Sequence, residues 1–148
     1  MVLQRWQTVY LFLAAVLMIV FAFMTSITIQ FGPQQYMLGA IYSGIAGETH
    51  PDMLLSVMDA LIVVITIITI FKYKNLKSQM NLCAICIALT IAMLLCIMVL
   101  AFTQKSNGTV SVMHLGNVLP IVAIVLYALA YRGIAHDKKL LSDSERLR

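Results

Sequence analysis

Five polar residues that could bind a ligand or exchange a proton lie in or beside the apolar stretches of this 148-residue chain. Asp59 is the formally charged residue well inside such a stretch, and His114 and Asn117, three residues apart, share a helical face. Thr25 and Ser26 lie at the end of another stretch. An ionisable group inside hydrocarbon costs at least a few kcal/mol unless it is solvated or paired. The sequence therefore predicts an intramembrane polar cluster in which Asp59 and His114 share a proton, bind a small cation or hold a polar ligand.

A purely structural role for the same residues stays open. Asp59 can make a structural hydrogen bond with Asn117 or His114, or water can reach it from outside. Polar side chains in membranes often serve packing alone. Transporters usually carry more intramembrane charge, broken helices or internal repeats, and the two halves of this chain show no convincing repeat.

Two cysteines form a weaker candidate site. Cys83 and Cys86 make a C-x-x-C pair on one helical face, which can do redox chemistry where a thiolate is accessible at a helix N-terminus. No acidic or basic helper is close in sequence, and cysteine also packs well between helices. His114 is the one histidine inside an apolar stretch, so a paired haem site is not expected. The sequence predicts no catalytic constellation, metal or cofactor, and we expect a non-enzymatic protein.

Four apolar runs must position these residues. They cover residues 9–29, 53–71, 82–102 and 110–131. Each is close to the ~20 residues that a helix needs to cross hydrocarbon. The chain is 61% hydrophobic and 11% charged, whereas soluble domains carry roughly 25% charged residues. The sequence predicts an all-α fold, an integral membrane four-helix bundle with antiparallel up-down-up-down topology that forms one transmembrane domain over residues 1–148.

The basic residues predict the orientation of this bundle. Nine of the ten Lys and Arg residues flank the runs on one side, and Lys105 is the exception. By the positive-inside rule, both termini and the tail 132–148 are cytoplasmic. Membrane orientation accounts for the excess of Lys and Arg over Asp and Glu, so a nucleic-acid partner is not expected. The expected partner is a lipid bilayer, and another membrane protein is a further candidate.

The connecting segments carry their own expectations. The outer loop 30–52 is too apolar for a disordered linker and predicts either a short strand pair or a half-embedded interfacial segment. Asp52 is a candidate N-cap for the second helix. Asn107-Gly108 predicts a tight turn between the third and fourth helices. The tail is expected to continue the fourth helix, with an amphipathic surface segment as the alternative.

Both ends of the chain also resemble a known family. The opening reads Val2-Leu-Gln-Arg-Trp-Gln-Thr-Val-Tyr-Leu11, and the ending runs from Arg132 to the closing Arg-Leu-Arg148. With the four-span layout, they resemble a bacterial family of small inner-membrane proteins described as a domain of unknown function. The resemblance implies the bacterial cytoplasmic membrane and four helices. It implies no activity and no site residues.

Three functions are compatible with these patterns. The leading interpretation is a non-enzymatic accessory or scaffolding subunit of a membrane complex. The alternative is a small transporter or a proton- or ligand-coupled protein that uses the polar cluster in the outer third of the bundle. A membrane thiol oxidoreductase built on Cys83 and Cys86 is the lesser alternative.

Overall fold

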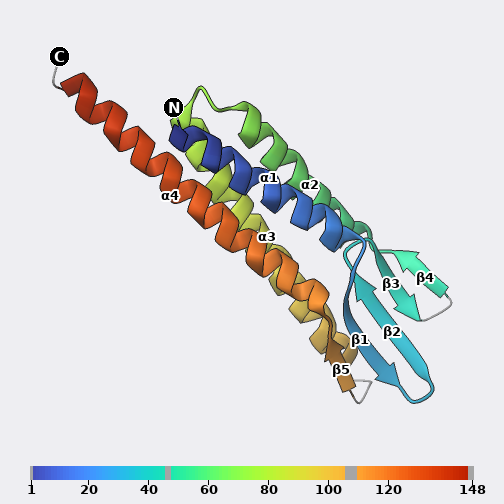
Figure 1. Ribbon diagram of the computed structural model, residues 1–148. Coiled ribbons are helices and arrows are strands. Elements are labelled where there is room, and N and C mark those ends of the chain that lie inside the picture. Colours follow the sequence, from blue (N-terminus) through green and yellow to red (C-terminus); the bar gives the residue numbers. More distant parts are fainter. Residues whose placement is uncertain (1, 46–47, 106–109, 147–148) are drawn as a thin grey trace.

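The computed structural model describes residues 2–45, 48–105 and 110–146, and in these ranges the chain is mostly helical. The helices are α1 (Val2–Ala22), α2 (Met53–Phe71), α3 (Leu76–Lys105) and α4 (Val118–Arg146). They lie side by side, and each of α1 and α3 packs against both α2 and α4 (Figure 1). We call these four helices the helical body. Both chain ends lie at one end of it, and a β-sheet lies at the other.

The interior of the helical body follows the helical repeat. The buried residues of α2 recur every three or four positions and form one inward stripe: Leu55, Asp59, Ile62, Thr66 and Thr69. The hydroxyls of Thr66 and Thr69 each donate to the carbonyl four residues earlier, at 2.7 Å. These bonds satisfy the hydroxyls without a partner helix, so threonine is tolerated among apolar neighbours.

Helix α2 begins where the sequence predicts. The carbonyl oxygen of Asp52 accepts from the backbone N–H of Ser56 at 3.1 Å, which makes Asp52 the residue that precedes the first turn. Its carboxylate, however, makes no capping hydrogen bond. The position of the helix start is confirmed, and the side-chain cap is not formed.

The sheet has five antiparallel strands in the order β4-β3-β2-β1-β5. They are β1 (Thr25–Phe31), β2 (Gln34–Gly39), β3 (Tyr42–Ile45), β4 (Glu48–Pro51) and β5 (Val110–Met113). The first four follow one another in the chain, whereas β5 arrives after α3 and pairs with β1. Gly32 has a φ of 59° in the two-residue turn between Phe31 and Gln34. Glycine followed by Pro33 suits the first central position of such a hairpin turn.

The sheet makes the all-α expectation wrong. The first apolar run was expected to be helical to residue 29, but α1 ends at Ala22 and β1 follows. The reason lies in Thr25-Ser-Ile-Thr-Ile-Gln-Phe31, where β-branched residues are common and polar and apolar types alternate. Of the two expectations for the outer loop 30–52, the strands are confirmed.

The fourth apolar run also begins differently from the prediction. Residues 110–113 form β5, a 3₁₀ turn η1 (Leu115–Asn117) follows, and α4 begins at Val118. Pro120 therefore lies in the first turn of α4, where its missing N–H needs no helical partner. At the other end, α4 continues to Arg146, so the predicted helical extension into the tail is confirmed. The turn predicted at Asn107-Gly108 lies outside the described residues.

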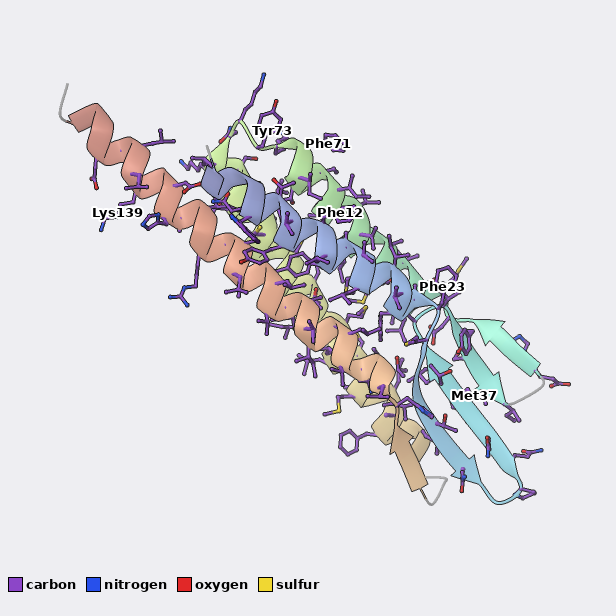
Figure 2. All side chains as sticks on the ribbon, viewed as in Figure 1. Phe12, Phe23, Met37, Phe71, Tyr73 and Lys139 are labelled. Carbon is purple, nitrogen blue, oxygen red and sulfur yellow. The ribbon has the colours of Figure 1, made fainter. Side chains whose placement is uncertain are left out.

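Apolar side chains cover the outside of the helical body. In the described part of the chain, three helices are long and apolar enough to cross a membrane: Met53–Phe71, Leu76–Thr103 and Leu115–Asp143. Trp6–Ala22 of α1 is a shorter apolar helix. Phe12, Phe23 and Phe71 project outward and are 61%, 73% and 76% exposed (Figure 2). A water-facing helix would carry polar residues at such positions, so these surfaces support a membrane protein.

Candidate functional site

Four of the five predicted polar residues meet where the sheet joins the helical body. Strand β1 has a bulge at Ser26, since its register with β2 shifts between Thr25 and Ile27. The carbonyl oxygen of Ser26 accepts two hydrogen bonds, from the backbone N–H of His114 and from Nδ2 of Asn117, both at 3.1 Å. The start of β1 is thereby tied to the turn that precedes α4. We call this region the junction.

Two side-chain pairs extend the junction. The ring Nε2 of His114 lies 2.7 Å from Oγ1 of Thr28, and Oγ1 of Thr25 lies 2.6 Å from the hydroxyl of Tyr42. Gly116 allows the close approach of η1 to β1, because a Cβ there would lie 2.7 Å from the backbone oxygen of Thr25. The predicted residues Thr25, Ser26, His114 and Asn117 thus come together.

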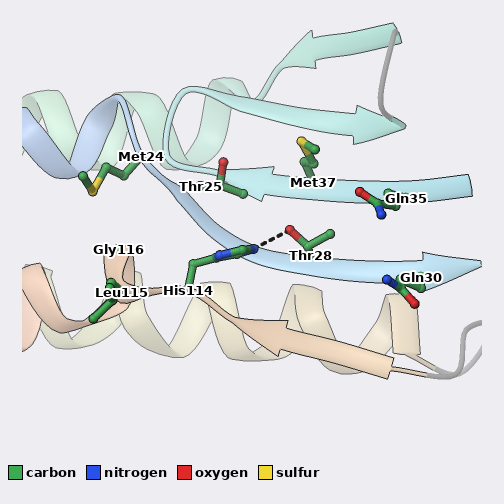
Figure 3. A pocket seen from close by; sticks show the side chains of 9 residues that line it. All are labelled: Met24, Thr25, Thr28, Gln30, Gln35, Met37, His114, Leu115 and Gly116. Carbon is green, nitrogen blue, oxygen red and sulfur yellow. Dashed lines mark hydrogen bonds between the residues drawn. The ribbon is translucent and has the colours of Figure 1, made fainter.

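A groove of about 510 Å³ opens beside the junction (Figure 3). We call it the junction groove, and its lining is Met24, Thr25, Thr28, Gln30, Gln35, Met37, His114, Leu115 and Gly116. Thr28 pairs with Met37 and Gln30 pairs with Gln35 in the β1–β2 ladder, so these four side chains share one face of the sheet. The lining contains no Asp, Glu, Lys or Arg. The groove therefore has both polar and apolar parts, and His114 is the one residue of its lining with an ionisable group in the neutral pH range.

The opposite face of the sheet is core. Ile27, Ile29 and Leu38 are 3%, 0% and 2% exposed, and β1 contacts α3. The alternation that buries Ile27 and Ile29 is what turns Thr28 and Gln30 towards the groove. Gln30, Gln35 and Tyr42 did not feature in the sequence-based site, although this period-two pattern and the Gly32-Pro33 turn would have placed both glutamines on one face.

Asp59 makes no hydrogen bond to the junction residues in the described chain. It faces the interior of the helical body, is 4% exposed, and its Oδ1 has no hydrogen-bond partner among the described residues. His114 bonds Thr28 instead of Asp59, and Asn117 bonds Ser26. Ser26 Oγ and Asn117 Oδ1 are likewise buried without a partner in the described chain. Three members of the predicted cluster therefore each keep one unsatisfied polar atom.

The cysteine pair belongs to a second polar cluster, in the middle of the helical body. Thr66 donates to the carbonyl of Ile62, so its hydroxyl accepts from Tyr127, whose hydroxyl oxygen is 2.7 Å away. The sulfur of Cys86 lies 3.6 Å from Oγ1 of Thr66, and both Cys83 and Cys86 are fully buried. A redox thiol needs access, so this geometry favours packing. Within the ranges described, no group of three His, Cys, Asp or Glu could hold a metal ion.

A third polar contact lies at the end of the helical body that carries the chain termini. The side chain of Gln7 is 2% exposed, and its Nε2 donates to Oδ2 of Asp137 at 2.6 Å. A Cβ at Gly133 would lie 3.0 Å from Cγ of Gln7. The contact joins α1 to α4 and was not anticipated from the sequence.

Comparison with known proteins agrees with the resemblance of the two chain ends. No curated protein matches the chain. The model of the family described as domain of unknown function DUF4293 matches residues 3–147, which is nearly the whole chain. The chain therefore belongs to this family of unknown function.

Proposed function

We propose that the protein crosses the bacterial inner membrane with all four helices and serves as a non-enzymatic accessory or scaffolding subunit of a membrane complex. In this proposal both termini are cytoplasmic, and the sheet holds a partner on the outer side. The observation that carries the proposal is strand β5, which in the described part of the chain pairs with β1 on one side and with no strand on the other.

The dimensions of the helices support the membrane location. Helix α2 has 19 residues, or about 28 Å at 1.5 Å per residue, close to the ~30 Å of a hydrocarbon core. Exposed apolar residues recur along every helix. Examples are Val16 of α1, Leu61 of α2, Val99 of α3 and Val125 of α4. Lipid contact accounts for such a surface on all sides of one body.

The charges support the orientation. The turn between α2 and α3 carries Lys72 and Lys74, and it lies at the same end as the two chain termini. Strands β1, β2 and β3 contain no Asp, Glu, Lys or Arg. Cytoplasmic loops carry the excess of Lys and Arg, so the sheet is on the outer side.

The two edges of the sheet differ in a way that indicates docking. Strand β4 carries Glu48 and Pro51, and charge and proline are common means of protecting an edge from pairing. Strand β5 reads Val-Ser-Val-Met, with neither charge nor proline. An unprotected edge accepts a strand from another protein through backbone hydrogen bonds. We assign the partner contact to β5.

The ladder identifies which backbone groups of β5 face outward. The N–H of His114 bonds Ser26, so the N–H groups of Val112 and Val110 also point towards β1, by the period-two geometry of a strand. The N–H groups of Ser111 and Met113 then point away from β1. Within the described chain, these are donors that a partner strand would use.

Ser111→Pro tests the proposal, because it removes an outward N–H and leaves the ladder with β1 in place. Loss of one such bond leaves a partner carbonyl unsatisfied at a cost of about 1–3 kcal/mol. We expect about tenfold less partner after purification in mild detergent and mass spectrometry, since 1.4 kcal/mol is tenfold in affinity. Ser111→Ala keeps the N–H and is the matched control.

Two results would overturn the docking role. One is a folded Ser111→Pro protein that retains the same partner at the wild-type level. The other is wild-type protein that purifies without any partner in stoichiometric amount. Circular dichroism of both variants provides the check on folding.

A second candidate function is a proton- or ligand-coupled role, and the unsatisfied atom of Asp59 supports it. Buried polar groups without partners are costly, and inside membranes they are often kept for transported ions or protons. Asp59→Asn removes the charge at nearly constant shape. Loss of growth with intact folding would favour coupling over scaffolding. Wild-type insertion, folding and growth would exclude a coupled role for Asp59.

A further inference from the structure

We infer that the junction groove binds a neutral amphiphile from the outer leaflet, a glycerolipid with an uncharged, hydroxyl-bearing head. The inference rests on the proposed membrane location, but not on the docking role of β5. It concerns the face of the sheet, whereas the partner contact concerns its edge.

The groove changes in polarity along its length. Met24, Leu115 and Gly116 line the end next to the helices, and Gln30 and Gln35 line the far end (Figure 3). Leu115 is 83% exposed beside the apolar surface of the helical body. A ligand with an apolar part towards the bilayer and a polar part away from it fits this gradient. Such a ligand is an amphiphile.

The lack of Asp, Glu, Lys and Arg in the lining defines the head group. None of the nine lining residues is Asp, Glu, Lys or Arg, and residues 25–45 contain no such residue either. A phosphate or carboxylate head would find no Lys or Arg there, and an ammonium would find no carboxylate. Removing an unpaired charge from water is strongly unfavourable. The lining therefore selects an uncharged head.

The polar groups that remain suit hydroxyls. Gln30 and Gln35 are exposed and lie opposite each other in the β1–β2 register, where Cβ atoms are about 4.5–5.5 Å apart. Each amide offers two donors and one acceptor, and a hydroxyl both donates and accepts. His114 uses Nε2 for Thr28, and within the described residues its second ring nitrogen is left for a ligand. Diol or sugar heads match this mixed set.

The apolar part of the groove can adapt to a lipid chain. Met24 and Met37 line it, and methionine fills irregular space because its side chain is unbranched and polarizable. The volume of about 510 Å³ lies within the roughly 300–1,000 Å³ of small-molecule sites. The groove therefore takes the head and the first part of a chain, while the rest of the lipid stays in the leaflet.

Native mass spectrometry of the full chain in nanodiscs tests the inference. The nanodiscs contain dioleoylphosphatidylcholine with a small fraction of either dioleoylglycerol or dioleoylphosphatidate, two lipids that differ in the phosphate alone. We expect wild-type protein to retain dioleoylglycerol about tenfold more than phosphatidate, a preference of about 1.4 kcal/mol. Equal retention of the two, or more phosphatidate, would overturn the inference.

Two substitutions in strand β2 locate the binding. Gln35→Ala is expected to lower retention of dioleoylglycerol several-fold. The matched control Gln34→Ala is the adjacent exposed glutamine, whose side chain points to the other face of the strand, and it should change nothing. If both variants behave alike, the groove is not the site.

A charge change gives an opposite readout. Gln35→Lys supplies a cation, so we expect the lipid preference to turn towards phosphatidate. Unchanged selectivity would count against the groove.

The orientation is checked separately by labelling Gln34→Cys from the outside with a membrane-impermeant thiol reagent. Labelling from the cytoplasmic side would overturn the orientation and with it the outer-leaflet source of the lipid. Ser111→Pro leaves the groove residues in place. Loss of lipid retention and loss of partner capture can therefore be observed separately, and each refutes a different proposal.

Discussion

Buried polar groups of the helical body and of the junction differ in whether they have hydrogen-bond partners. In the helical body, the hydroxyls of Thr66, Thr69 and Thr90 donate to carbonyls four residues earlier, and Tyr127 bonds Thr66. At the junction, Ser26 Oγ and Asn117 Oδ1 are buried and stay unsatisfied in the described chain, while Thr25, Thr28 and His114 line the open groove.

This difference separates stability from recognition. Polar residues that bond within their own helix can sit in hydrocarbon as packing groups. Polar residues that line a groove, such as Thr28 and His114, are available for a ligand. Asp59 is the exception in the helical body, since it is buried and its Oδ1 has no partner in the described chain. We therefore expect the helical body to provide stability and the junction to provide recognition, and Asp59 remains the group to test for coupling.

The largest effect is expected in the helical body, from Tyr127→Ala. The ring of Tyr127 is fully buried, and removal of a buried aromatic ring typically costs about 3–5 kcal/mol. Tyr127→Phe loses the hydroxyl bond to Thr66 alone, at about 0.5–1.5 kcal/mol. Unfolding of both variants in mixed micelles measures the two values. Equal costs would contradict the view that the ring fills the centre of the helical body.

An intermediate effect is expected at the junction, from Gly116→Ala. The new Cβ would lie 2.7 Å from a backbone oxygen of Thr25, and overpacking of this kind costs about 1–3 kcal/mol. Amide exchange of His114, whose N–H bonds Ser26, should accelerate. Exchange of Lys72, whose N–H bonds Ile68 at the other end of the molecule, should stay unchanged. Acceleration at both amides would show that junction and helical body unfold as one unit.

The smallest effect is expected from Thr28→Val. The substitution removes the hydroxyl that bonds His114, but His114 is exposed, so water replaces the lost partner. We expect a cost of no more than about 1 kcal/mol. Thr66→Val in the helical body is the matched comparison, because it leaves the buried hydroxyl of Tyr127 without its acceptor and should cost more. A larger cost for Thr28→Val would reverse the comparison between the two regions.

Part of the candidate site could be predicted from residue types and positions. Thr25, Ser26, His114 and Asn117 were expected together because each lies near the outer end of an apolar run. They do meet, although as parts of a strand, a loop and a 3₁₀ turn instead of two helices. The inward face of Asp59 follows from the helical repeat of α2. Its neighbours do not follow, since a helical repeat specifies a face and not what packs against it.

The residue pattern was enough to predict four apolar helices, the bounds of α2 at Met53 and Phe71, the side on which the basic residues gather, and the family resemblance. These properties are local, because hydrophobic runs and charge positions depend on neighbouring residues alone. The folded chain was needed to show that β5 joins β1, that Ser26 forms a bulge bonded to His114, and that a groove opens between β1, β2 and η1. Pairing of segments so far apart in the chain depends on backbone hydrogen bonds and on the packing of α3 and α4, which residue patterns do not encode locally.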